Sequence, residues 1–237
     1  MQIKGILSTW CLLLLPIGTL AQGSTTFSDE SFDAANWQLN IAWEINPGTT
    51  TADFQQVATG GNLGPFGRVN MTSSSPNAVA LLLLNAVYDP GNQGPIASII
   101  TSANLRATGN IPYRPLIFQG GNYFYGLWAM GVDSTTWTPF AFGTNVLTQA
   151  RFIGVGAANS LRPDFSAAGQ PIQFGFMVDH GTTFSPRNSD LGVDNWVVTI
   201  TTVPEPTAYA LIILTLAAFR MVRQRTWLAM HKIPKPP

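Results

Sequence analysis

Four aspartates near the two ends of the 22–202 segment are the residues best suited to hold a metal ion. Asp29 and Asp33 lie close to its start, and Asp190 and Asp194 lie close to its end. Carboxylate and carbonyl oxygens are the hard ligands that calcium prefers. If the first and last strands of the domain are neighbours, Asp29, Asp33 and Asp194 would meet around one calcium ion. The alternative is that the first two form turns and that Asp194 is a charge that protects an edge strand.

A second candidate site is the densest group of aromatic side chains, between residues 122 and 137. Tyr123, Tyr125 and Trp128 are the predicted ligand-binding residues, because exposed rings can stack on the apolar faces of sugars while their polar atoms find partners. In an extended strand, Tyr123 and Tyr125 would share one face and Phe124 would lie on the other. The competing interpretation is that these rings belong to the core.

Residues for catalysis are scarce. The single cysteine, Cys11, lies in the N-terminal apolar run, and His180 is the only histidine before the C-terminal tail. Residues 22–202 therefore contain one histidine and no cysteine. These supply neither a nucleophile–base pair nor the usual zinc ligands. Glu44 has no second acid at a spacing that pairs the two for glycoside hydrolysis. We therefore predict no catalytic residue.

The charge of residues 22–202 further narrows the possible functions. Six arginines, no lysine and eleven acids give this segment a formal charge of −5, although the whole chain sums to zero. Nucleic-acid binding requires cations along a phosphate track, and the segment has no basic cluster. A nucleic-acid partner is not expected.

The elements that must position these residues are strands. The runs 37–43, 172–178 and 196–200 alternate apolar and polar residues, which is the period of a half-buried strand. The run 78–87 is more continuously apolar, as expected of a central strand covered on both faces. Glycine- and proline-rich turns separate these runs, and residues 22–202 are predicted to form one antiparallel β-sandwich of the jelly-roll type.

The N-terminus has the layout of a secretory signal peptide over residues 1–21. Lys4 precedes an apolar run, and small residues at positions 19 and 21 indicate cleavage by signal peptidase between Ala21 and Gln22. An uncleaved membrane anchor is the alternative.

The C-terminus carries a second targeting pattern. Residues 207–219 are uncharged and largely apolar, and arginines follow them. Thirteen helical residues span about 20 Å, which is short for a permanent membrane helix. The positive-inside rule places the arginines in the cytoplasm and the preceding domain outside. Residues 226–237 would then form a cytoplasmic tail.

Residues 203–225 resemble the PEP-CTERM sorting domain. The resemblance rests on the order of a Pro-Glu-Pro motif, an apolar helix and an arginine cluster, carried by Val203, Pro204, Glu205, Pro206, Arg220, Arg223 and Arg225. It implies a Gram-negative host, brief anchoring in the inner membrane, cleavage by an exosortase and delivery to the cell surface or extracellular matrix. A plain single-span anchor is the alternative.

The body resembles the concanavalin A/laminin-G-like jelly rolls. The similarity rests on an ordered set of short motifs: the 27–33 segment before Trp37, the 60–64 glycine turn, the 88–90 and 93–96 segments, and the 192–196 segment before the sorting signal. It implies a carbohydrate-binding or adhesive module with extracellular polysaccharide as a partner. The sequence thus predicts a non-enzymatic surface or matrix protein, and the alternative is a secreted glycan lyase or hydrolase on the same fold.

Overall fold

The computed structural model describes the body of the chain and six residues of the C-terminal region. The described residues are 23–42, 49–74, 78–127, 129–141, 147–179, 187–203, and 212, 213, 215, 216, 219 and 220. Several predicted features lie outside them: the signal peptide with Ala21 and Gln22, the aromatic Trp128, the lone His180, and Pro204, Glu205, Pro206, Arg223 and Arg225 of the sorting motif. No helix among the described residues is both long enough and apolar enough to cross a membrane.

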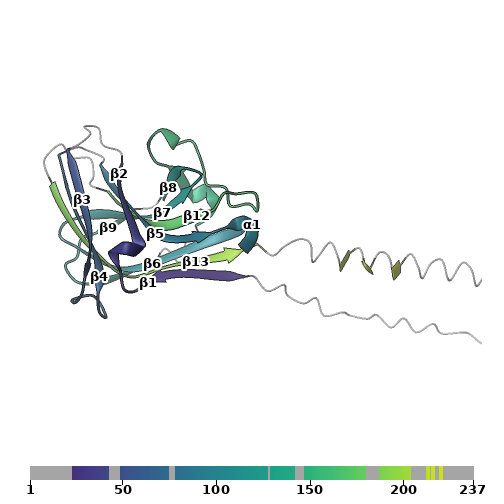
Figure 1. Cartoon of the computed structure of the whole chain (residues 1–237), viewed down its shortest axis with the longest axis horizontal. Helices are drawn as coiled ribbons and strands as arrows, with labels where there is room; N and C mark the ends of the chain where they lie inside the picture. Colours follow the sequence, from purple (N-terminus) through teal and green to yellow (C-terminus); the bar gives the residue numbers. More distant parts are fainter. Residues whose placement is uncertain are drawn as a thin grey trace, which may run out of the picture.

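Two antiparallel sheets form a β-sandwich, as the sequence predicted (Figure 1). The first sheet has the order β10-β6-β13-β4-β3, with β1 added beside β13. Its strands are β1 (Ser24–Asp29), β3 (Thr50–Val57), β4 (Phe66–Ser73), β6 (Ile96–Ala107), β10 (Thr138–Ala141) and β13 (Arg187–Thr202).

The second sheet has seven strands in the order β11-β8-β7-β12-β5-β2, with β9 beside β7. They are β2 (Trp37–Ala42), β5 (Val79–Tyr88), β7 (Ile111–Gln119), β8 (Asn122–Gly126), β9 (Met130–Val132), β11 (Phe152–Gly154) and β12 (Ile172–Asp179). Short helices complete the described body: η1 (Ala34–Asn36), α1 (Pro90–Gln93), η2 (Gln149–Arg151) and η3 (Gly156–Ala158).

The core lies between the sheets and is built by alternation along the strands. Trp37 of β2, Phe176 of β12 and Trp196 of β13 meet there, with ring centroids of Trp37 5.4 Å from Phe176 and 5.1 Å from Trp196. Each of these residues belongs to a run that the sequence predicted to be a half-buried strand. Burial of such large aromatic side chains supplies much of the apolar area that stabilises a domain without disulfides.

Strand β5 is covered on both faces from Val79 to Leu84, as the apolar run predicted, whereas Asn85 and Val87 are exposed. Leu82 and Leu84 face the core between the sheets. Leu81 and Leu83 belong to a second buried cluster on the opposite face, with Met177 of β12. The outer face of the seven-stranded sheet is therefore partly a second, smaller core.

The first and last strands of the described body are neighbours, as predicted. β1 pairs with β13 from Ser24–Thr201 to Asp29–Trp196. The amide of Thr202 donates to the carbonyl of Gly23 at 3.0 Å, and Val203 donates to Pro95 at 2.8 Å. The body thus begins and ends at the same end of the sandwich, beside α1 (Figure 1).

Candidate functional site

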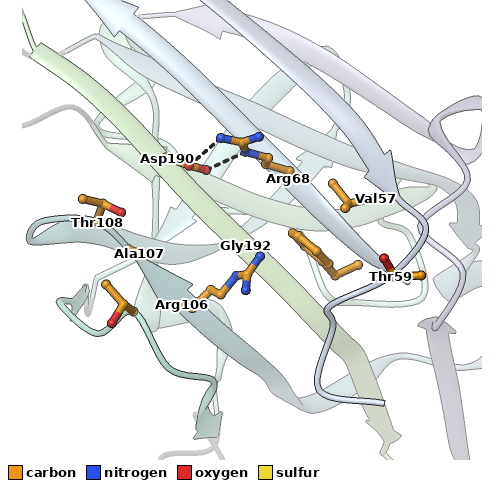
Figure 2. A pocket seen from close by; sticks show the side chains of 10 residues that line it. Val57, Thr59, Arg68, Arg106, Ala107, Thr108, Asp190 and Gly192 are labelled. Atoms are coloured by element: carbon orange, nitrogen blue, oxygen red, sulfur yellow. Dashed lines mark hydrogen bonds and ion pairs between the residues drawn. The ribbon is translucent and has the colours of Figure 1, made fainter. Parts of the chain in front are cut away.

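A polar pocket opens on the outer face of the six-stranded sheet, where β3, β4, β13 and β6 lie side by side (Figure 2). Its volume is about 380 Å³. Residues from distant parts of the chain line it, among them two arginines, one aspartate and three threonines. The described lining residues are Val57, Thr59, Phe66, Arg68, Arg106, Ala107, Thr108, Thr135, Asp190 and Gly192.

An ion pair between β4 and β13 forms one side of this pocket. Arg68 Nε donates to Asp190 Oδ1 at 2.9 Å, and Nη2 donates to Oδ2 at 2.7 Å. This two-bond geometry matches the planar guanidinium to the carboxylate. Hydrogen bonding to Asp190, together with its negative charge, raises the pKa of Arg68. Both side chains are about 40% exposed (42% and 41%), so a ligand can reach them.

Arg106 of β6 approaches the pocket from the side of β13 opposite Arg68. Its guanidinium group lies against two aromatic rings, those of Phe66 and Trp137. The Arg106 guanidinium carbon is 4.4 Å from the ring centroid of Phe66 and 4.7 Å from that of Trp137. The two rings are themselves 5.2 Å apart, edge to face. Figure 2 shows the guanidinium groups of Arg68 and Arg106 reaching toward β13 from the flanking strands.

Glycine at position 192 makes room for this arrangement. A Cβ there would lie 2.9 Å from Arg106 Cγ and 2.9 Å from a ring carbon of Trp137. Such contacts are closer than side chains tolerate, so any larger residue would displace the arginine or the indole. Gly192 is therefore part of the floor that fixes the position of Arg106.

The loop of residues 58–65, between β3 and β4, holds one wall of the pocket in place. The backbone amide of Asn62 donates to Asp194 Oδ2, and the Trp137 indole donates to the carbonyl of Gly60 at 3.0 Å. Within this loop, the backbone at Gly61 packs so closely against Gly64 that a Cβ on residue 61 would lie 2.5 Å from the Gly64 carbonyl oxygen. Asp194 is thus buried as an anchor for this loop.

Asp29, one of the predicted calcium ligands, lies instead in a network of its own. Oδ1 accepts from the amides of Ser31 and Phe32 at 2.8 Å and from the Ser31 hydroxyl at 2.7 Å. Oδ2 accepts from the Trp37 indole at 2.8 Å. Burial alone would raise the pKa of Asp29, but the hydrogen bonds from Ser31, Trp37 and Phe32 together outweigh it and lower the pKa.

The other predicted calcium ligands also have local partners. Asp33 caps η1 by accepting from the amide of Ala35 at 3.0 Å, and it is exposed. Asp190 pairs with Arg68, as described above. Within the described ranges, no three His, Cys, Asp or Glu side chains come close enough together to hold a metal ion. These geometries match the turn-forming alternative for Asp29 and Asp33, and the calcium site stays a prediction.

The predicted aromatic site is divided between the two faces of β8. Phe124 is buried in the main core, whereas Tyr123 and Tyr125 lie on the outer face, packed against the second cluster. The guanidinium carbon of Arg114 is 5.2 Å from the Tyr125 ring centroid. Burial raises the pKa of both tyrosines. Both rings are half-buried against this cluster, and ligand binding by Tyr123 and Tyr125 stays a prediction.

The residues that sequence reasoning missed are Arg68, Arg106 and Phe66. Arg68 and Asp190 are 122 positions apart, and no local pattern connects them. Trp137 is the last residue of the aromatic group between residues 122 and 137, and its place beside Arg106 could not be predicted from that group. The available signal was weak: Arg68 and Arg106 are each flanked by apolar residues at alternate positions, which places them on the outward faces of strands.

The fold and the pocket together define the class of protein: it is an all-β sandwich with an open polar pocket on one sheet. No family model matches the chain, and no curated protein matches it.

Among solved structures, one similar protein is the family 11 carbohydrate-binding module of the cellulosomal cellulase Lic26A-Cel5E of Clostridium thermocellum. It shares 12% identity over 78% of this chain and 98% of that chain, with a TM-score of 0.45. A carbohydrate-binding module studied for specific mannan recognition, TmCBM27, shares 11% identity over 77% and 98%, with a TM-score of 0.37.

A third similar structure is the enzymatically active domain of tailspike protein 4 of bacteriophage CBA120. It shares 12% identity over 72% of this chain and 20% of that chain, with a TM-score of 0.36. Identities of 11–12% and TM-scores below 0.5 do not indicate a function for this chain. The functional proposal therefore rests on the pocket.

Proposed function

We propose that this protein is a non-enzymatic, exported surface or matrix protein whose pocket on the six-stranded sheet binds carbohydrate. The observation that carries this proposal is the convergence of Arg68, Asp190 and Arg106 with three threonine residues around one open hollow. Most small-molecule sites are largely apolar with a few polar groups. A hollow rich in donors and acceptors instead suits a ligand that presents many hydroxyl groups.

The ion pair supports a binding role for polyhydroxylated ligands. Asp190 can accept hydrogen bonds from neighbouring hydroxyls on lone pairs that Arg68 does not use, and Arg68 retains free donors. Two parallel hydrogen bonds hold the two groups in place before a ligand binds. A preformed site loses less entropy when it binds.

The pocket gives no support to glycoside hydrolysis. That chemistry requires two carboxyl groups across the scissile bond. Among the described residues that line the pocket, Asp190 is the one carboxylate, and it is held by Arg68. A secreted lyase or hydrolase is the rival proposal, and His180, which one form of it would use, lies outside the described residues.

Export and sorting are supported by the sequence alone. We propose that signal peptidase cleaves between Ala21 and Gln22, and that an exosortase acts near Pro204-Glu205-Pro206 after the helix has anchored the protein briefly in the inner membrane. The described body ends at Val203, so both cuts would leave every described strand intact.

The test is a binding measurement with a charge-neutral double substitution. The purified protein is screened against immobilised neutral and acidic glycans, and the Arg68→Gln/Asp190→Asn variant is compared with it. Removing the pair without changing net charge should weaken binding at least about tenfold, because the hydrogen bonds between the ligand and these two charged groups are lost. The matched control is Arg162→Gln/Asp164→Asn, which makes the same two changes at exposed positions that do not line the pocket.

Two results would contradict the proposal. Binding to no glycan would overturn the function. Binding that survives the pocket variant but is lost in Tyr123→Ala/Tyr125→Ala would move the site to the outer face of the other sheet. Thermal melting of each variant shows whether the fold is retained.

A further inference from the structure

We infer that Arg106 makes this pocket a subsite for the carboxylate of an acidic sugar, such as a uronic acid unit of a polysaccharide. This inference rests on the proposed function, because it assigns the class of glycan to the same pocket. It follows from three properties of the Arg106 side chain. Two aromatic rings hold it in place, no described residue accepts a hydrogen bond from its guanidinium group, and the residues that line the pocket carry more positive than negative charge.

The support for Arg106 is rigid and apolar. Phe66, which is 2% exposed, and Trp137 contact the guanidinium, and the indole of Trp137 is itself fixed by its hydrogen bond to Gly60. Cation–π contacts hold the charge in place without using any N–H donor. The donors of Arg106 therefore remain available to a ligand in the pocket.

Arg106 lacks an acceptor in the part of the chain that the structure describes. No described oxygen receives a hydrogen bond from its guanidinium, and its contacts are those with Phe66 and Trp137. A guanidinium carries five donors in a planar fork that matches a carboxylate with two parallel bonds. A half-buried arginine with this fork unused is suited to bind a planar anion.

The charges around Arg106 favour an anion in the pocket. The carboxylate of Asp190, which could have neutralised Arg106, is already bonded twice to Arg68. The residues that line this hollow carry two guanidinium groups and one carboxylate, an excess of one positive charge, although residues 22–202 carry a formal charge of −5. Partial burial reduces screening by salt, so a carboxylate would bind at the pocket more strongly than elsewhere on an acidic body.

The experiment compares two ligands that differ in the carboxylate alone. An oligomer of galacturonic acid and the same oligomer as its methyl ester are titrated into the purified protein by calorimetry. The acid should bind at least about tenfold more tightly, since a charge-assisted pair of hydrogen bonds is lost in the ester. Arg106→Gln should remove this preference, and Arg106→Lys should keep part of it, because lysine retains the charge without the fork.

The control is Arg162→Gln, which removes an exposed arginine whose hydrogen bonds go to its own loop. It should keep the full preference for the acid. Equal binding of acid and ester would overturn the carboxylate subsite while leaving carbohydrate binding intact. If neither oligomer binds but a neutral glycan does, the inference is wrong and the proposed function stands. If no glycan binds at all, both fall. A preference for the acid that survives in a folded Arg106→Gln would also overturn the inference.

Discussion

At the scale of single residues, Asp29 shows how a candidate ligand becomes a structural group. Its two oxygens accept four hydrogen bonds and join β1 to the first residue of β2, Trp37, in the other sheet. The sequence could predict a turn at 29–33, because aspartate and serine favour such turns. The Trp37 contact could not be predicted, since it requires the two sheets to be in place.

Replacing Asp29 with asparagine should destabilise the fold by about 2 kcal/mol, because charge-assisted hydrogen bonds to buried donors are weakened. The lowered pKa of Asp29 gives this loss a pH dependence. The stabilisation is fully present above the ordinary aspartate pKa of 3.8 and is lost as the pH falls through the lower pKa of the folded state. The difference in melting temperature between wild type and Asp29→Asn should therefore shrink between pH 6 and pH 3.

The control for this experiment is Asp33→Asn. Asp33 caps η1 while exposed, and asparagine is about as good an N-cap, so little stability should be lost. An Asp29→Asn difference that stays constant down to pH 3 would contradict the role of its charge.

At the scale of elements, the alternation of apolar and polar residues along the chain predicted several strands of the β-sandwich. The runs containing Trp37, Phe176 and Trp196 became β2, β12 and β13, with these side chains in the core. Alternation could not predict which strands pair, because register depends on neighbours far away in the chain. For the same reason the pocket could not be predicted: it requires β4 and β6 to flank β13, and hence Arg68 and Arg106 to face one another across it.

The pairing of β12 with β5 depends on Gly175. The register shifts between Gln173 and Gly175, and a Cβ at Gly175 would lie 1.8 Å from the Leu82 carbonyl oxygen. Gly175→Ala should therefore destabilise the protein by about 3 kcal/mol or more, since backbone must move to accept the methyl group. Chemical denaturation measures the change.

Gly120→Ala is the matched control for Gly175→Ala. Gly120 lies in the β7–β8 turn with a φ of 57° and nothing within 4 Å of a new Cβ. Its cost is limited to backbone strain of about 1 kcal/mol. Equal losses in the two variants would show that close approach to Leu82 is not what requires glycine.

At the scale of the whole molecule, the folded body and the two targeting patterns should separate during export. Protein recovered from the surface of its host should begin at Gln22 and should lack Arg220, Arg223 and Arg225. Intact-mass spectrometry with sequencing of both termini measures this directly. Recovery of surface protein that retains the three arginines would contradict sorting by an exosortase.

The length of β13 has a mechanical consequence. Asp190 and Gly192 of the pocket and Val203, the last described residue of the body, all lie on or directly after this 16-residue strand. Tension between a ligand held in the pocket and an attachment beyond Val203 would run along one stretch of backbone. β6 pairs with that stretch on one side, and β4 and then β1 pair on the other. Such a pull loads many interstrand hydrogen bonds in shear at once, instead of peeling them apart one by one.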